Sequence, residues 1–209
     1  MQRLIQGVGQ NSPTAYDKIY LQRKEAGIDV FDLKRWNKLL KFYKGGRLIE
    51  LGCLDSLVPQ IAKKKYPHAE IWAIDIAKKT IDELEKKYPN IYYQVGDVYR
   101  NRFPQNYFDY CVAGELIEHL ERPEDFLRET FRVLKNGGTL ALSTPKGETK
   151  KGEVDKERHL WSYEIDDIKK LLEPYGEIII KVMRSQYFPR YIYHFPTIIA
   201  YVRKTRKTY

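Results

Sequence analysis

The stretch that decides the fold reads Gly45-Gly46-Arg47-Leu48-Ile49-Glu50-Leu51-Gly52-Cys53-Leu54-Asp55-Ser56. Its two leading glycines mark a loop, and residues 47–51 form a short run of the kind that lies inside a parallel sheet. Asp55 or Ser56 is placed to cap a helix over residues 57–65, which Tyr66-Pro67 ends. A strand, a glycine at its carboxyl end and an immediate helix place backbone N–H groups beside a crevice. Nucleotide-like ligands bind in such crevices.

The next segment, residues 70–75, is a second strand that ends on an acidic residue, Asp75. A carboxylate at this point of an α/β fold accepts hydrogen bonds from two sugar hydroxyls. The dinucleotide-binding version of the motif carries a full G-x-G-x-x-G, and that pattern is missing here. The two segments together predict a site for a nucleoside-containing ligand.

Strand and helix signals alternate along the rest of the chain. The expected helices are 78–88, 123–134 and 163–172, and the expected strands are 91–95, 107–113, 139–143, 177–183 and 197–203. Residues 11–14 are expected to form a loop, residues 136–138 to end a helix, and the segment before residue 44 to be helical in parts. This alternation predicts an α/β fold with parallel pairing.

Composition places the chain among globular proteins. It has 209 residues, 43% hydrophobic and 31% charged, which predicts one domain over residues 1–209. No apolar run approaches the roughly 18 residues of a membrane span, and no signal-peptide pattern opens the sequence, so we expect a cytoplasmic protein. Cys53 and Cys111 lie at predicted strand ends and are expected to be buried thiols.

The formal charge of +9 is concentrated near the end of the sequence. Residues 181–209 hold seven basic residues and no acidic one. Such a face attracts RNA, DNA or an anionic small substrate, and the alternative is a solvated tail without a specific partner.

Several ordered motifs carry a resemblance to a known family. They are Glu50-x-Gly52, Phe108-Asp109-Tyr110, Gly114-Glu115-Leu116-Ile117-Glu118-His119-Leu120, Phe131-Arg132-Val133-Leu134-Lys135-Asn136-Gly137-Gly138 and Ser143-Thr144-Pro145. The set resembles the class I S-adenosylmethionine (SAM) methyltransferases, in particular the subgroup with the ubiquinone-pathway O-methyltransferases. The resemblance extends over about residues 40–203.

The resemblance implies a Rossmann-like sheet of seven strands in the order 3-2-1-4-5-7-6, with the last strand antiparallel and helices on both faces. It also implies a division into an N-terminal helical lid (1–44), a SAM-binding half (45–145) and a substrate-side half (146–209). SAM would lie across the carboxyl ends of the first strands.

The same resemblance assigns cofactor contacts to eight residues of this sequence. Glu50 and Gly52 would border the methionine part, Asp75 would hold the ribose, Ile76 would pack on adenine, Asp97 and the Val98 backbone would meet the adenine edge, and Gly114 and Glu115 would lie near the sulfonium. The alternative for Asp75 and Asp97 is that they cap a helix or a turn. The sequence departs from the family at Leu54 and Ser56, where small glycines are usual, so Leu54 either points away from the cofactor or narrows its pocket.

Glu118 and His119 are the candidate catalytic residues. Methyl transfer requires alignment and removal of a proton from a hydroxyl acceptor, and His119 is the predicted base because imidazole titrates near neutrality. Glu115, Glu118 and His119 have E-x-x-E-H spacing, and with His159 they resemble the metal site of small-RNA terminal 2′-O-methyltransferases. Such a ligand set suits Mn²⁺, Fe²⁺ or Zn²⁺ better than Mg²⁺. The alternative is that Glu118 is solvated and His159 holds a loop, so the metal is unknown.

The sequence thus predicts a SAM-dependent methyltransferase acting on a hydroxyl or amine of a small molecule. One alternative keeps the reaction and changes the acceptor to RNA, using the basic C-terminal face. A second alternative, motivated by Leu54, is a non-catalytic, methyltransferase-like partner subunit. The acceptor would be shaped by the N-terminal segment with Tyr16 and Tyr20, by the loop 146–157 and by the insertion 187–196. The oligomeric state cannot be read from the sequence.

Overall fold

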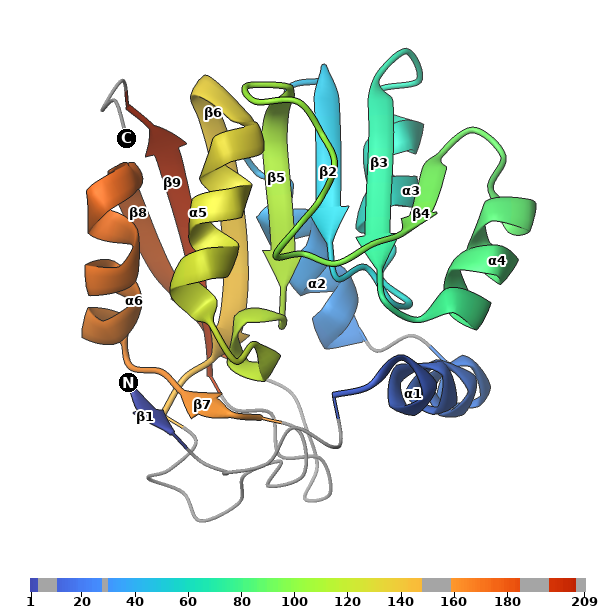
Figure 1. Cartoon of the computed structure of the whole chain (residues 1–209), viewed down its shortest axis with the longest axis horizontal. Helices are drawn as coiled ribbons and strands as arrows, with labels where there is room; N and C mark the ends of the chain where they lie inside the picture. Colours follow the sequence, from blue (N-terminus) through green and yellow to red (C-terminus); the bar gives the residue numbers. More distant parts are fainter. Residues whose placement is uncertain (4–10, 28–29, 148–158, 185–195, 206–209) are drawn as a thin grey trace.

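A seven-stranded sheet forms the centre of the computed structural model, which describes residues 1–3, 11–27, 30–147, 159–184 and 196–205 (Figure 1). The strands of this sheet lie in the order β4-β3-β2-β5-β6-β9-β8. They are β2 (Arg47–Leu51), β3 (Glu70–Asp75), β4 (Tyr92–Val95), β5 (Phe108–Gly114), β6 (Leu134–Pro145), β8 (Gly176–Met183) and β9 (Thr197–Lys204). Strand β9 runs antiparallel to both of its neighbours, while the pairs from β4 to β6 are parallel. Numbered by their sequence order, these strands read 3-2-1-4-5-7-6, which confirms the predicted fold class.

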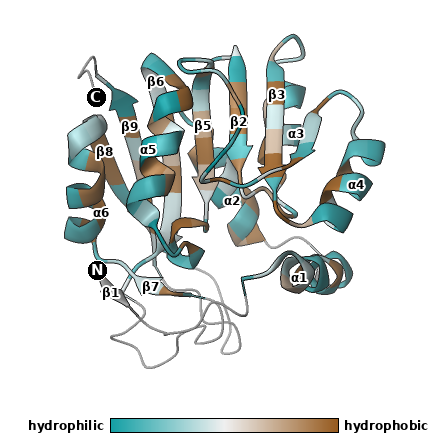
Figure 2. Cartoon of the chain, in the orientation of Figure 1, coloured by the Kyte–Doolittle hydropathy of each residue, from teal (hydrophilic) through white to brown (hydrophobic). Residues whose placement is uncertain are grey.

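Helices cover both faces of the sheet. They are α1 (Pro13–Ala26), α2 (Val30–Leu39), α3 (Val58–Lys65), α4 (Lys78–Lys87), α5 (Pro123–Val133) and α6 (Ile165–Leu172), with short 3₁₀ turns at Ile117–His119 and Glu173–Tyr175. Side chains from α2, α3 and α4 join one apolar cluster with the sheet, and side chains from α5 and α6 join another. The central strands carry apolar residues on both sides, as expected for parallel strands covered twice (Figure 2).

The predicted strands over residues 47–51 and 70–75 have the bounds observed for β2 and β3. Residues 11–14 were wrongly expected to be a loop, because α1 begins at Pro13. The Ser12 hydroxyl accepts a hydrogen bond from the Ala15 N–H at 3.3 Å, and Pro13 occupies the first helical turn, where its missing N–H costs nothing.

Two further boundaries differ from the prediction. Residues 136–138 do not end a helix, because α5 ends at Val133 and β6 starts at once, with Leu134 paired to Phe108. The last predicted helix starts at Ile165 rather than at residue 163. Glu164 caps it, together with Asp167, and the preceding residues form a two-residue strand, β7 (Trp161–Ser162), which pairs with β1 (Gln2–Arg3).

Cys53 and Cys111 are buried free thiols, as predicted, although Cys111 lies in the middle of β5 and not at its end. Within the described ranges, none of the helices has the length and apolar character needed to cross a membrane.

Candidate active site

The carboxyl ends of neighbouring strands bring the predicted cofactor residues to one edge of the sheet. The Gly52 N–H, just after β2, donates to the Ile74 carbonyl of β3 at 2.9 Å, and the Gly96 N–H, just after β4, donates to the Asp75 carbonyl at 3.0 Å. Gly114 ends β5, the neighbour of β2 on its other side. Parallel strands therefore place the turns that follow them side by side, which is where open α/β sheets bind ligands.

Asp75 is 6% exposed, and its carboxylate is occupied by backbone donors. One oxygen accepts from the Leu54 N–H and the other from the Ala77 N–H, each at 2.9 Å. Burial raises the pKa of Asp75, and these backbone hydrogen bonds counteract that rise. Asp75 therefore caps the turn after β3, which is the alternative that the sequence left open. A carboxylate has about four lone-pair sites, so capacity for further donors remains.

Gly52 and Leu54 show how tightly this turn is built. Gly52 has a φ of 71°, and a Cβ placed on it would lie 2.7 Å from a methyl carbon of Leu116. A side chain at this position would therefore be strained and would displace Leu116. Leu54, which stands where the family has a glycine, has a φ of 35° and donates its N–H to Asp75. The leucine thus adopts a left-handed conformation in spite of its side chain.

Glu50 is a buried carboxylate with an unsatisfied atom. Its side chain is 1% exposed at the end of β2, and its Oε2 has no hydrogen-bond partner in the part of the chain that the structure describes. Burial raises the pKa of Glu50 well above its ordinary value, opposed by the Ser56 hydroxyl and by Arg35. A buried acceptor without a partner is costly, and a cationic ligand group would satisfy it.

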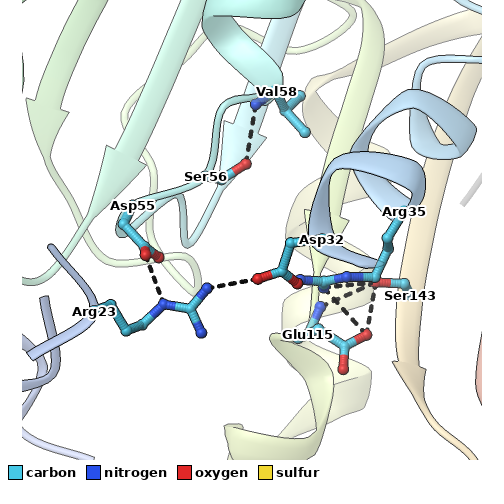
Figure 3. Close-up of polar contacts among 8 residues, drawn as sticks. All are labelled: Arg23, Asp32, Arg35, Asp55, Ser56, Val58, Glu115 and Ser143. Atoms are coloured by element: carbon cyan, nitrogen blue, oxygen red, sulfur yellow. Dashed lines mark hydrogen bonds and ion pairs between the residues drawn. The ribbon is translucent and has the colours of Figure 1, made fainter. Parts of the chain in front are cut away.

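Arg35 is a site residue that the sequence prediction missed. It comes from α2 and is 7% exposed, and Figure 3 shows its guanidinium between Asp32, Glu115 and Ser143. It donates to Asp32 Oδ1 at 2.6 Å and to Ser143 Oγ at 3.4 Å, and it lies 3.3 Å from Glu115 Oε1. Burial alone would lower the pKa of Arg35, but Glu115 and Asp32 raise it. The sequence did carry a signal for it. Arg35 lies four residues after Phe31 and four residues before Leu39, so helical periodicity places it on the same buried face of α2 as these two apolar residues.

Glu115 is fixed by β6 as well as by Arg35. Its backbone has a φ of 51°, its N–H donates to the Ser143 carbonyl at 2.9 Å, and its carboxylate accepts from the Ser143 hydroxyl at 2.8 Å. Its side chain remains 28% exposed. The acidic group is therefore held in place at the strand ends while it still reaches solvent.

The ion pairs continue from Arg35 into α1, which lies below the carboxyl ends of β2 and β3 in Figure 1. Arg23 of α1 binds Asp32 at 2.9 Å and Asp55 at 2.6 Å, as Figure 3 shows. We call the series Asp55, Arg23, Asp32, Arg35 and Glu115 the charge chain. It joins the turn after β2, both N-terminal helices and the end of β5.

The remaining predicted cofactor residues lie after β3 and β4. Asp97 is exposed and its Oδ1 accepts from the Tyr99 N–H at 2.8 Å, so it caps a turn, while Val98 is buried and Ile76 is half-buried. Tyr20 is 7% exposed, which favours the packing role over ligand contact. Tyr16 instead lies beside the candidate base, with its ring 6.1 Å from that of His119.

Glu118, His119 and His159 form a second polar cluster. One ligand atom from each lies within 4.8 Å of the others, and the two imidazole rings are 4.7 Å apart. The Leu160 N–H donates to the Glu118 carbonyl at 2.7 Å, which ties the segment that carries His159 to the turn after β5. The fourth residue of the predicted ligand set, Glu115, is bound to Ser143 and Arg35 instead.

Glu118 was expected to be solvated if it bound no metal, and this was wrong, because its side chain is fully buried. Its Oε2 accepts from the Thr144 hydroxyl at 3.0 Å, and its Oε1 has no hydrogen-bond partner among the residues described. Burial and then Glu115 raise the pKa of Glu118 to about 8, while His159 lowers it. A buried carboxylate with one oxygen lacking a hydrogen-bond partner, grouped with two imidazoles, is a donor set that fits a divalent cation.

Comparison with known proteins identifies the domain. Residues 49–142 match the family model described as a methyltransferase domain. With the strand order and the turn after β2, this match identifies these residues as a methyltransferase domain of the class I, SAM-dependent type, as the sequence motifs predicted.

Two curated relatives show how far the likeness extends. The biotin biosynthesis bifunctional protein BioHC of Teredinibacter turnerae is 31% identical over 116 residues, which are 50% of this chain and 20% of that protein. The ubiquinone/menaquinone biosynthesis C-methyltransferase UbiE of Desulfotalea psychrophila is 25% identical over 111 residues, which are 50% of this chain and 45% of that protein. The chain therefore matches less than half of the length of either relative.

A solved structure shares the fold over most of the chain. It is a chain of the structure titled “Complex between the Haloferax volcanii Trm112 methyltransferase activator and the putative methyltransferase”. The TM-score is 0.73 at 13% identity, and the match covers 91% of this chain and 98% of that chain. At this identity the likeness concerns the fold alone.

Proposed function

We propose that this chain binds S-adenosylmethionine and transfers its methyl group to a hydroxyl or amine of a small-molecule acceptor. The observation that carries the proposal is the set of strand ends at Gly52, Asp75 and Gly114, with the unpaired Oε2 of buried Glu50 among them. One relative is named as a C-methyltransferase, so carbon acceptors belong in the test of the acceptor class.

The residues at these strand ends fit the chemistry of the cofactor. When bound, SAM supplies a methyl group activated by a positively charged sulfur, and it also carries an ammonium and a carboxylate. Glu50 and Glu115 offer anionic groups for the positive parts, and Arg35 is a buried cation for the carboxylate. Asp75 keeps lone pairs for the ribose hydroxyls, and Ile76, Asp97 and Val98 are proposed to face the adenine.

The protein's own task in such a transfer is to align the acceptor and to remove its proton. His119 is the proposed base, and Tyr16 and Asn11 surround it: the Asn11 amide donates to the His119 carbonyl at 3.2 Å and accepts from the Tyr16 hydroxyl at 2.8 Å. This arrangement orders the turn that carries the imidazole beside the N-terminal helix. An ordered base favours an in-line approach of the acceptor.

Calorimetry with S-adenosylhomocysteine tests the binding part of the proposal. We expect one site and a thermal stabilisation that grows with ligand concentration. Absence of both heat and thermal shift would support the non-catalytic subunit instead. A panel of hydroxyl, amine and carbon acceptors, scored by release of S-adenosylhomocysteine, then tests the acceptor class.

We further propose that Glu118, His119 and His159 bind a divalent cation next to the acceptor. The support is that one ligand atom from each residue lies within 4.8 Å of the others, and that Glu118 Oε1 has no hydrogen-bond partner among the described residues. With the cation bound, His119 is a ligand and not the base, and the cation assists a hydroxyl acceptor by polarising its oxygen and so lowering its pKa. The alternative RNA acceptor depends on the basic residues of 181–209, and 185–195 and 206–209 lie outside the described residues. The two segments expected to shape the acceptor site, 146–157 and 187–196, lie largely outside them too.

A titration with Mn²⁺ tests the cation site without any turnover. The wild type should bind one ion, and His159→Ala should weaken binding by at least about tenfold, because it removes a direct ligand. His68→Ala is the matched control, since His68 is an exposed histidine on the loop before β3, and it should bind as the wild type does. Equal affinity of both variants, or full activity after chelation, would exclude the metal.

A further inference from the structure

The three proposed cation ligands come from two segments that lie far apart in the sequence. Glu118 and His119 belong to the turn after β5, and His159 lies just before β7. Figure 1 shows β7 beside that turn. Bringing the two segments together has an entropic cost, because a long loop of the chain must be closed. Contacts within the protein that close this loop would therefore add to the affinity for a cation.

Two hydrogen bonds join the two segments. The Leu160 N–H donates to the Glu118 carbonyl, and the Trp161 indole Nε1–H donates to the Leu120 carbonyl, each at 2.7 Å. Leu160 is fully buried, so moving it would expose apolar surface. The Trp161 side chain thus binds the turn after β5 from a position two residues beyond His159.

The carboxylate of Glu118 is oriented from a third element, β6. The Thr144 hydroxyl donates to Glu118 Oε2 at 3.0 Å, and both residues are fully buried. This bond restricts the rotation of the carboxylate, whose other oxygen, Oε1, lacks a hydrogen-bond partner among the described residues. A hydrogen bond from a neighbouring group to a ligand side chain fixes its orientation and raises metal affinity.

We propose that Thr144 and Trp161 are positioning residues that assemble the cation site. Thr144 orients the Glu118 carboxylate, and Trp161 holds His159 against the turn after β5. Both act through the ligands and not by direct contact with the ion. The inference rests on the proposed cation binding, and it adds the residues outside the ligand set on which the affinity depends.

Trp161→Phe removes the indole N–H and keeps an aromatic ring in its place. Calorimetric titration with Mn²⁺ should give an affinity about fivefold weaker than that of the wild type, because a hydrogen bond that closes the site is lost. The matched control is Trp72→Phe. The Trp72 indole donates to Glu70 at 2.8 Å from β3, a strand that pairs with neither β5 nor β6. This control should bind Mn²⁺ as the wild type does.

Thr144→Val removes the hydroxyl and keeps nearly the same volume. The affinity for Mn²⁺ should fall by at least about tenfold, because the ligand carboxylate loses the group that orients it. The matched control is Thr130→Val. Thr130 is also fully buried, and its hydroxyl donates to the Phe126 carbonyl at 2.9 Å within α5. The control should keep the affinity of the wild type.

Two further measurements separate positioning from a general loss of stability. In His159→Ala, the addition of Trp161→Phe should weaken Mn²⁺ binding no further, because Trp161 acts through His159. Without any metal, the Leu160 amide should exchange faster in Trp161→Phe than in Trp72→Phe, because the joined segments separate more often.

The inference is overturned if either variant binds Mn²⁺ as its control does, if the losses in the double variant are additive, or if exchange of the Leu160 amide is unchanged. Failure of the proposed cation binding gives a different result: the wild type itself would then bind no Mn²⁺, and the inference would fall with the site.

Discussion

At the scale of single residues, Glu50 has opposed roles in stability and in ligand binding. It is buried with an unpaired oxygen, and burial raises its pKa well above the ordinary value. A carboxyl group whose pKa is raised on folding contributes stability at low pH, and this stability is lost as the pH rises through the folded-state pKa. Ionisation of Glu50 inside the folded chain is therefore costly, and a cationic ligand group offsets that cost.

We predict that Glu50→Gln is more stable than the wild type at alkaline pH and binds S-adenosylhomocysteine at least about tenfold more weakly, because a charged hydrogen bond is lost. Each pKa unit of difference is worth about 1.4 kcal/mol, and 1 kcal/mol moves the Tm of a chain of this size by about 2 to 4 °C. Melting curves at several pH values measure the first effect. Glu85→Gln, at an exposed position of α4, should change neither quantity. A stability gain that does not grow with pH would contradict this account.

Gly52 is the second residue whose role can be isolated. Gly52→Ala should be destabilised both by its positive φ and by contact with Leu116, whereas Gly137→Ala, at a φ of 77° with open space around it, should show only the conformational cost of about 1 to 2 kcal/mol. Urea unfolding of both variants measures the difference, which we expect to be about 1 kcal/mol. Adding Leu116→Ala should reduce the excess cost of Gly52→Ala, and independent effects of the two substitutions would argue against the contact.

At the scale of elements, the charge chain holds α1 against the strand ends. Arg23 contacts acids on the turn after β2 and on α2, but its side chain is 43% exposed, so each pair is worth about 0 to 1 kcal/mol. The helix has other contacts as well, since Asp17 accepts from the Thr80 N–H at 3.1 Å and Lys24 pairs with Glu83. The global stability should therefore depend little on Arg23, while the local stability of α1 depends on it.

We predict that Arg23→Ala speeds amide hydrogen exchange throughout α1 and shifts the Tm by less than about 4 °C. Exchange in α3 and in β2 should not change, because their amides are protected by the sheet core. Lys78→Ala removes an exposed pair with Asp82 on α4 and serves as the control. Unchanged exchange in α1 would mean that Tyr20 and the other packed side chains hold this helix without the ion pairs.

The elements themselves could largely be predicted from the sequence, because apolar runs such as 47–51 and 70–75 are bounded by glycine, proline or an acid. The predicted boundaries were wrong where a side chain sets the start of a helix. Ser12 caps α1 and Glu164 caps α6, each by accepting a hydrogen bond from a backbone N–H. The site was partly out of reach for a different reason. Arg35 meets Ser143 across 108 residues, and this contact depends on which strand lies beside β5.

At the scale of the whole molecule, one sheet separates two apolar clusters, and both clusters draw residues from the same strands. Loss of either cluster would expose one face of the sheet. We therefore propose that the chain, including residues 1–44, unfolds as one unit, as the prediction of one domain requires.

The three tryptophans test this, because they report from different places: Trp36 on α2, Trp72 on β3 and Trp161 on β7. Three variants each keep a single tryptophan and carry phenylalanine at the other two positions. In each variant, the urea midpoint from tryptophan fluorescence should equal the midpoint for unfolding of the whole chain of that same variant. An earlier transition at Trp36 would show that the N-terminal segment folds separately from the sheet.

The exposure of the pair between Arg23 and Asp55 has a consequence for how the protein is assayed. Ions in the buffer screen such exposed pairs, so concentrated buffer should weaken the attachment of α1 to the turn after β2. Buried groups such as Arg35 are screened much less, so the strand ends should keep their arrangement. Cofactor affinity and turnover should consequently be recorded along one ionic-strength series.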